Sequence, residues 1–379
     1  MQIKNLYKAI KKFVFNLYSN NLQGHALARA KNLINLMYGI MRSKKSSLSG
    51  IAEGMPGRTQ DKTEEKDRKP KKFASKVKQI KRWLMSQHNN YETHFFPLAV
   101  ILLEVLAKRG ELIFAIDGSI IGNGCIGLMI SVVFQGRSLP ICWVVRKGKK
   151  GHFPERMHVE LLEQLKTITP DEVNIIILGD GEFDGCQVQQ TCADFEWKYA
   201  FRASKSVLIT QEEETFQLKD MALGALPYLF FEGVFYTAKE YGEVNVGYFH
   251  QKGYKDPLCL VTNFESIEEA HQYYKKRFLI ETFFSDIKSR GFNAQKSKLE
   301  DPERISTLLI PLCLNYIFTI QQAIQAFLQE LVPFLTYENK KEASLFTIGR
   351  RMLLFCEENF LKIKFSLSTF LYSKFCVPL

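Results

Sequence analysis

The sequence predicts an α/β fold: a mixed sheet covered by helices, preceded by a small all-α region and followed by further helices. Two observations predict it. From Leu112 to about residue 203, apolar runs of strand length alternate with helical stretches, whereas the first residues carry apolar positions at helical spacing. The chain has 379 residues, 46% of them hydrophobic and 24% charged, which is enough to bury a sizeable core in two or three domains.

Residues 1–90 are helical in pattern and strongly basic. Apolar residues recur at helical spacing through residues 1–45, and the serines of SSLSGIAEG can cap a short helix. This region holds 20 lysines and arginines against 5 acidic residues, while the rest of the chain carries a slight acidic excess. A basic module ahead of an acidic body is typical of polyanion binding, so we expect a helical DNA-binding domain here. The alternative is a basic, partly disordered tail that aids solubility.

A polar segment and a basic helix complete this region. Residues 54–72 are charged and almost free of apolar residues, which predicts a linker. The helix that follows has an apolar side and a cluster of cations, and we expect these cations to contact the DNA backbone: Lys76, Lys78, Lys81 and Arg82. Such contacts give salt-sensitive affinity without sequence information.

The core is predicted over residues 110–330. Three strands (LIFAID, CIGLMISVVF, LPICWVV) precede a helix at 155–165, the strand VNIIILGD, a helix at about 184–194 and the strand WKYAFRA. The order βββαβαβ with short connections describes the ribonuclease-H-like arrangement, a mixed sheet covered by helices. Aromatic-rich segments in 206–264 predict a β-rich insertion, and helices at about 267–290 and 302–328 precede a C-terminal helical tail over 331–379.

The cysteines and the apolar runs bear on the compartment. The eight cysteines form no C-x-x-C pair and have no histidines at zinc-ligand spacing, which favours a reducing compartment without zinc. The apolar run at 307–320 is shorter than the roughly 20 residues that span a bilayer. Lys8, Lys11 and Lys12 interrupt the N-terminal apolar stretch before it reaches signal-peptide length. We therefore expect a cytoplasmic protein with no membrane partner.

Two aspartates stand at the predicted ends of apolar strands. Asp117 ends LIFAID and Asp180 ends IIILGD. Neighbouring strand ends bring such side chains within a few ångströms of each other. Two carboxylates that close repel unless a cation neutralises them, and Mg²⁺ prefers oxygen ligands of this kind. Taken singly, each aspartate could instead be a turn or helix-cap residue.

The segment YYKKRFLIETFFSDIKSRGF supplies a third acidic residue. On a regular helix, its polar members fall within roughly 60° of one another, opposite an apolar stripe suited to packing on the sheet. These residues are Tyr274, Arg277, Glu281 and Lys288. The simpler alternative is a solvated face with intrahelical ion pairs.

The spacing of these four residues, Y-x2-R-x3-E-x6-K, resembles the signature of the insertion-sequence-four family of DDE transposases. The resemblance covers roughly residues 112–330 and includes DGS at the first aspartate, GDGEFDG at the second and the β-rich insertion. It implies a catalytic, metal-binding triad, with two cations holding phosphates and a phenol that donates to phosphate or stacks. The triad is Asp117, Asp180 and Glu281, the cations are Arg277 and Lys288, and the phenol is Tyr274.

The resemblance further implies cut-and-paste transposition. The enzyme would bind terminal inverted repeats, cleave DNA and join the released ends to target DNA, using two Mg²⁺ ions for which Mn²⁺ can substitute. Its expected partner is double-stranded DNA, bound as a homodimer in the bacterial cytoplasm without a nucleotide cofactor. The alternatives are another ribonuclease-H-like DNA endonuclease and an inactive, transposase-derived DNA-binding protein.

Overall fold

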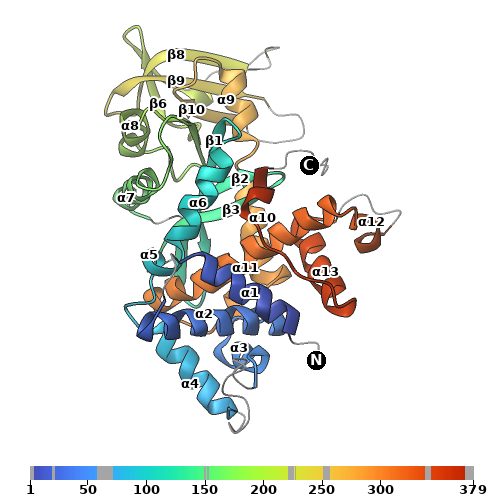
Figure 1. Cartoon of the computed structure of the whole chain (residues 1–379). Coiled ribbons are helices and arrows are strands. Elements are labelled where there is room, and N and C mark those ends of the chain that lie inside the picture. Colours follow the sequence, from blue (N-terminus) through green and yellow to red (C-terminus); the bar gives the residue numbers. More distant parts are fainter. Residues whose placement is uncertain are drawn as a thin grey trace.

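A single ten-stranded sheet runs through the protein, in the order β3-β2-β1-β4-β5-β10-β9-β8-β6-β7 (Figure 1). The computed structural model describes residues 4–18, 22–57, 71–148, 151, 153–220, 226, 228–250, 257–337 and 343–371. The strands are β1 (Glu111–Ile120), β2 (Cys125–Phe134), β3 (Arg137–Lys147), β4 (Asn174–Gly179), β5 (Lys198–Arg202), β6 (Leu208–Gln211), β7 (Glu214–Gln217), β8 (Tyr228–Tyr236), β9 (Tyr241–Phe249) and β10 (Leu258–Thr262).

The first five strands form the predicted mixed sheet. β1 is antiparallel to β2 and parallel to β4, while β3 pairs antiparallel with β2 and β5 pairs parallel with β4. The helices α7 (Glu155–Lys166) and α8 (Cys186–Asp194) connect β3 to β4 and β4 to β5. The predicted order βββαβαβ is therefore confirmed, as is the mixed α/β class.

The predicted β-rich insertion is confirmed and continues the same sheet. β10 pairs antiparallel with β5, and β9, β8, β6 and β7 follow outward from it. A short 3-10 turn, η2 (Leu218–Asp220), follows β7. In Figure 1 these outer strands lie at one end of the molecule and the N-terminal helices at the other. The insertion thus shares backbone hydrogen bonds with the core.

One face of the sheet near β1, β4 and β5 carries a separate apolar cluster. Side chains alternate along each strand, so this face takes every second residue of neighbouring strands. The helix α9 (Ile267–Tyr274) packs on it through Ile267 and Ala270. The strand members of the cluster include Ile113, Ile176, Leu178, Ala200 and Leu260. We call this side of the sheet the α9 face.

The N-terminal helices pack on the body of the protein. They are α1 (Lys4–Asn16), α2 (Gly24–Ser43), α3 (Leu48–Gly54) and α4 (Phe73–Leu84), followed by α5 (Tyr91–His94) and α6 (Phe96–Ala107). Ser47 caps α3 by accepting a hydrogen bond from the backbone N–H of Gly50, as the sequence predicts. Of the predicted linker, residues 58–70 lie outside the described residues. These helices and the core share one apolar cluster, and their role as a separate DNA-binding domain stays a prediction.

The helix predicted at 302–328 is confirmed as α11 (Pro302–Leu328), and it is longer than the apolar run from which we argued against a membrane span. Its length and composition would allow it to cross a membrane, but 94% of its most apolar stretch is buried in the fold, as in a core helix. In the tail, α12 (Val332–Leu335), α13 (Leu345–Glu358) and the short turn η5 (Leu367–Leu371) follow, with α13 packed on α11.

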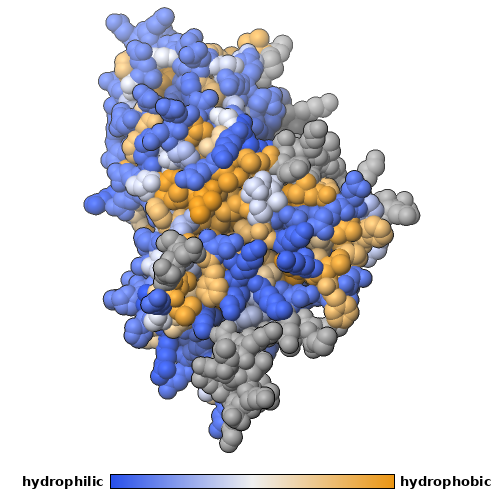
Figure 2. Space-filling view, in the orientation of Figure 1, coloured by the Kyte–Doolittle hydropathy of each residue, from blue (hydrophilic) through white to orange (hydrophobic). Residues whose placement is uncertain are grey.

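Figure 2 shows an apolar band at the place of α6 in Figure 1, where Ile101 is exposed.

A buried ion pair ties β3 to the segment after the core helices. Arg137 Nη1 lies 3.3 Å from Asp286 Oδ2, and both side chains are almost fully buried. Burial raises the pKa of Asp286 to about 6, against the opposing effects of Arg137 and, to a smaller extent, of Arg290 and Arg350. The carboxylate is thus ionised at neutral pH beside a guanidinium that cannot lose its proton.

Candidate active site

The two strand-borne aspartates lie side by side. The last residues that β1 and β4 pair are Ile116 and Gly179, so Asp117 and Asp180 follow at the same level of two adjacent strands. Both project to the α9 face, because they continue the alternation of its apolar residues. Asp117 is 2% exposed and Asp180 is partly buried. The parallel register therefore brings these two carboxylates together as the sequence predicts.

One detail of this prediction is wrong. We expected Asp117 to end its strand, but β1 continues to Ile120. The reason is that β1 has two neighbours of different length: β4 stops at Gly179, while β2 keeps pairing, with Met129 opposite Asp117. The backbone of Asp117 is thus paired with β2, while its side chain projects from the α9 face.

The predicted single helix over 267–290 is also wrong. α9 ends at Tyr274, a turn occupies 275–278, α10 (Leu279–Ser285) follows, and a π-helical turn, η3 (Asp286–Arg290), closes the segment before the 3-10 turn η4 (Ala294–Lys296). Through residues 276–281 the backbone hydrogen bonds span three residues rather than four, which tightens the chain. The two helices pack on different parts of the sheet. α9 contacts β4, β5, β9 and β10, whereas α10 contacts β3 and β1.

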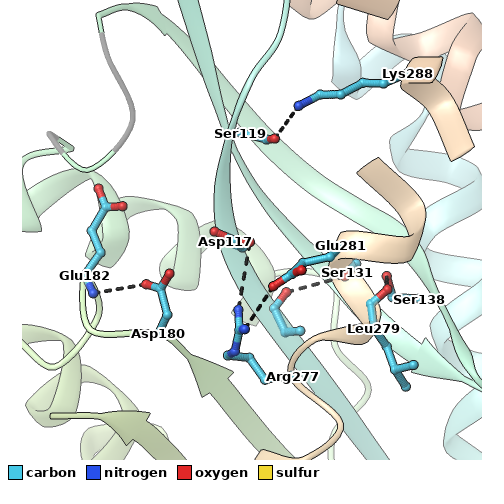
Figure 3. A network of polar contacts seen from close by, with 11 residues as sticks. Asp117, Ser119, Ser131, Ser138, Asp180, Glu182, Arg277, Leu279, Glu281 and Lys288 are labelled. Atoms are coloured by element: carbon cyan, nitrogen blue, oxygen red, sulfur yellow. Dashed lines mark hydrogen bonds and ion pairs between the residues drawn. The ribbon is translucent and has the colours of Figure 1, made fainter. Parts of the chain in front are cut away.

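This segment is therefore not one regular helix, yet its polar residues still approach β1. Arg277 lies in the turn and Glu281 in the first turn of α10. Lys288 lies in η3 with backbone angles outside the helical region. Figure 3 shows all three side chains directed toward β1.

Arg277 lies between two of the predicted metal ligands. Its guanidinium is 3.0 Å from Glu281 Oε1 and 3.9 Å from Asp117 Oδ2 (Figure 3). Burial acts to lower the pKa of Arg277, but Tyr274, Glu281 and Asp117 outweigh it and raise the pKa. The Glu281 side chain is 59% exposed, whereas that of Arg277 is 16% exposed.

Tyr274 is partly buried beside Arg277. Burial raises the pKa of Tyr274; the Arg277 and Arg202 cations act against this effect, and Asp180 adds to it. The phenol thus lies within electrostatic range of both a predicted ligand and two cations.

Sequence reasoning missed Arg202, the last residue of β5. Gly179 of β4 pairs with Phe201, so Arg202 follows at the level of Asp180 and on the same face. Three adjacent strands thus place Asp117, Asp180 and Arg202 in one row. The signal was the run WKYAFRA, an apolar strand ending in a cation as the other two end in carboxylates.

Lys288 reaches the site from η3. Its ammonium donates a hydrogen bond of 2.5 Å to the Ser119 hydroxyl and lies 5.5 Å from the centre of the Phe284 ring. Ser119 is two residues beyond Asp117 on β1 and therefore on the same face. The Lys288 ammonium is thus held on the face of β1 that carries Asp117, and phosphate binding by it stays a prediction.

The acidic residues after Asp180 are used elsewhere. The backbone N–H of Glu182 donates to Asp180 Oδ1 at 3.1 Å, while the Glu182 side chain points away and accepts from the backbone N–H of Phe153 (Figure 3). Asp184 accepts a hydrogen bond of 2.8 Å from the Tyr236 hydroxyl. Asp180 is therefore the acidic residue of this loop that faces Asp117.

The basic helix of the N-terminal region is α4. Lys78, Lys81 and Arg82 are exposed on it. Lys76 is half-buried, and its ammonium donates to the carbonyl of Met55 at 2.7 Å, at the end of α3. Among the described residues, the other three cations have no such hydrogen bond to the backbone, and DNA contact by this helix stays a prediction.

The fold and the site define an α/β protein in which two acidic side chains, Asp117 and Asp180, lie on adjacent inner strands of a mixed sheet, near the carboxyl end of β4. The family model described as "Transposase DDE domain" matches residues 108–318, more than half of the chain. None of the curated proteins matches at a significant level. Among solved structures, the cryo-EM structure of the piggyBac transposase synaptic complex with hairpin DNA is similar, with a TM-score of 0.45 and 9% identity over 94% of this chain and 78% of that chain.

The chain belongs to the transposase DDE domain family. It is therefore a transposase, an enzyme that acts on DNA.

Proposed function

We propose that this transposase binds the terminal inverted repeats of an insertion sequence, cleaves them and joins the released ends to target DNA. The observation that carries the proposal is the row of Asp117 and Asp180 on adjacent strands, with Glu281 and Arg277 above it. The first five strands form a ribonuclease-H-like core in this proposal, and the enzyme works in the bacterial cytoplasm as a dimer on DNA.

The donor set fits hard divalent cations. Asp117, Asp180 and Glu281 offer only carboxylate oxygens, the ligands that Mg²⁺ prefers and Mn²⁺ accepts. Within the described residues, no group of three His, Cys, Asp or Glu side chains is close enough to hold an ion as it stands. Arg277 already places a positive charge between two of the three carboxylates, which supports the proposal of a cation at this position.

Divalent ions held by Asp117, Asp180 and Glu281 would neutralise charge on the scissile phosphate and activate the attacking water or hydroxyl. The protein's own cations hold the substrate. Arg277, with planar, paired N–H donors, binds a phosphate beside Glu281. Lys288 binds one on the β1 side, and Arg202 binds one on the β5 side. Tyr274 donates a hydrogen bond to phosphate between them.

The position of Arg277 makes a prediction about metal binding. Because its guanidinium must leave Asp117 and Glu281 before an ion can reach them, we expect Arg277→Met to bind Mn²⁺ about tenfold more tightly in the absence of DNA. Calorimetric titration of Mn²⁺ into the parent and the variant measures this. Lys276→Met, which removes a neighbouring cation that stacks on Tyr273, is the matched control and should change the affinity little. Weaker Mn²⁺ binding by Arg277→Met would show that Arg277 orients the carboxylates instead.

The proposed function is tested with DNA that carries the sequences flanking the gene. We expect Mg²⁺-dependent nicking at the tips of the inverted repeats, followed by joining of the released 3′-hydroxyl to target DNA. Glu281→Gln should bind the same DNA with unchanged affinity and do neither. Cleavage without joining, or at sites unrelated to the repeats, would favour a DNA endonuclease. Binding without cleavage by the parent under varied metals would favour an inactive DNA-binding relative.

A further inference from the structure

Ser119 has a contact that no role assigned so far explains. It is the third residue of the run DGS on β1 and is 9% exposed. Its hydroxyl accepts the 2.5 Å hydrogen bond from the ammonium of Lys288, which arrives from a segment 169 residues later in the chain. Because side chains alternate along a strand, Ser119 and Asp117 share the α9 face.

The backbone around Lys288 does not by itself fix where the ammonium lies. Lys288 has φ −82° and ψ −106°, outside the helical region, within the π-helical turn that ends the segment. A lysine side chain has four carbons and many rotamers, which makes it costly to hold in one place. The Phe284 ring lies on one side of the ammonium, and the Ser119 hydroxyl supplies a directional contact.

The chemistry of the two groups suits this task. A serine hydroxyl has two lone pairs that can accept from an ammonium, and an ammonium has three N–H donors. Donation to Ser119 is therefore compatible with donation to a phosphate. The hydroxyl is also small enough for a nearly buried strand position beside Asp117.

We propose that Ser119 is a positioning residue, which holds the Lys288 ammonium on the face of β1 that carries Asp117, so that Lys288 meets the phosphate of bound DNA. This rests on the proposed function. Ser119 does not touch the reacting atoms in this role. It acts only through Lys288, and that dependence can be measured.

A double-mutant cycle tests the dependence. Ser119→Ala should lower the single-turnover rate of nicking about tenfold, the loss expected for one hydrogen bond to a charged group. Ser119→Thr keeps the hydroxyl and should restore the rate to within about threefold. In a Lys288→Met background, Ser119→Ala should change the rate less than about twofold, because residues that act through one contact are not additive.

Ser131→Ala is the matched control. Ser131 is fully buried on β2 and donates to the backbone carbonyl of Ala115, but it contacts no cation within the described part of the chain. This variant should nick at nearly the parental rate. Thermal unfolding midpoints of all variants verify the fold, and Ser119→Cys, with its weak acceptor, takes the place of Ser119→Ala if that variant unfolds.

The possible outcomes separate the two proposals. If the parent nicks DNA and Ser119→Ala loses the same factor with and without Lys288, the positioning role is overturned. If the parent binds the repeat DNA but does not cut, the proposed function fails, and the same cycle is read from dissociation constants. Additive effects on affinity would again overturn the role of Ser119. A parent that neither binds nor cuts overturns both proposals.

Discussion

Asp117→Asn is expected to lower the rate of DNA cleavage by about a thousandfold or more, because a bound metal ion contributes several kcal/mol to transition-state stabilisation. Asparagine keeps the size of the side chain and one oxygen but removes the charge. Asp117 lies 3.9 Å from Arg277 and is nearly fully buried, so water cannot take the place of its carboxylate. Affinity for the repeat DNA should stay within a few-fold of the parent. Single-turnover cleavage and a binding assay in Ca²⁺ measure the two quantities.

Asp184→Asn is the control for this prediction. Asp184 lies four residues beyond Asp180 and is partly buried, but it accepts a hydrogen bond from Tyr236, away from Asp117. Asparagine can still accept that bond, so cleavage should stay near the parental rate. If Asp184→Asn cleaves DNA as slowly as Asp117→Asn, the assignment of Asp180 as the acidic residue of this loop is wrong.

Asp286→Asn is expected to lower the free energy of unfolding by about 3–5 kcal/mol near pH 7.5, where the carboxylate of the parent is ionised. The change leaves the guanidinium of Arg137 buried and without its charged partner 3.3 Å away. Arginine cannot relieve this by losing a proton, so the desolvation cost stays. Urea denaturation of parent and variant gives the difference.

The exposed pair Lys45–Glu53 provides the comparison. Its atoms are 2.9 Å apart, closer than those of the buried pair, but both side chains are more than half exposed. Glu53→Gln should therefore cost less than about 1 kcal/mol. Equal losses for Asp286→Asn and Glu53→Gln would contradict the argument that burial, rather than distance, sets the cost.

Much of the fold follows from local pattern. The apolar runs that predict β1 to β5 are buried strands, and the apolar stretch at 302–328 is a buried helix, because continuous apolar sequence has to be covered on all sides. The two aspartates could be paired from sequence alone, since each follows such a run and parallel strands end at one edge.

The rest depends on which surfaces the segments meet. Nothing in YYKKRFLIETFFSDIKSR marks a break at Arg277; the break arises because α9 and α10 pack on different parts of the sheet. Arg202 and Ser119 carry no motif of their own. Their places are set by strand register with Asp180 and by the approach of Lys288 across the fold, and both are tertiary properties.

The order of the strands also determines when the residues of the candidate site can come together during synthesis of the chain. β5, beside the acidic row, gains its second neighbour only when β10 has left the ribosome, and Glu281 follows later still. Long-range pairing of this kind forms slowly, after the intervening loop has closed. A nascent or prematurely terminated chain that stops before residue 281 lacks the third carboxylate. Under the proposed function, such an unfinished chain is expected to leave the DNA that encodes it uncut.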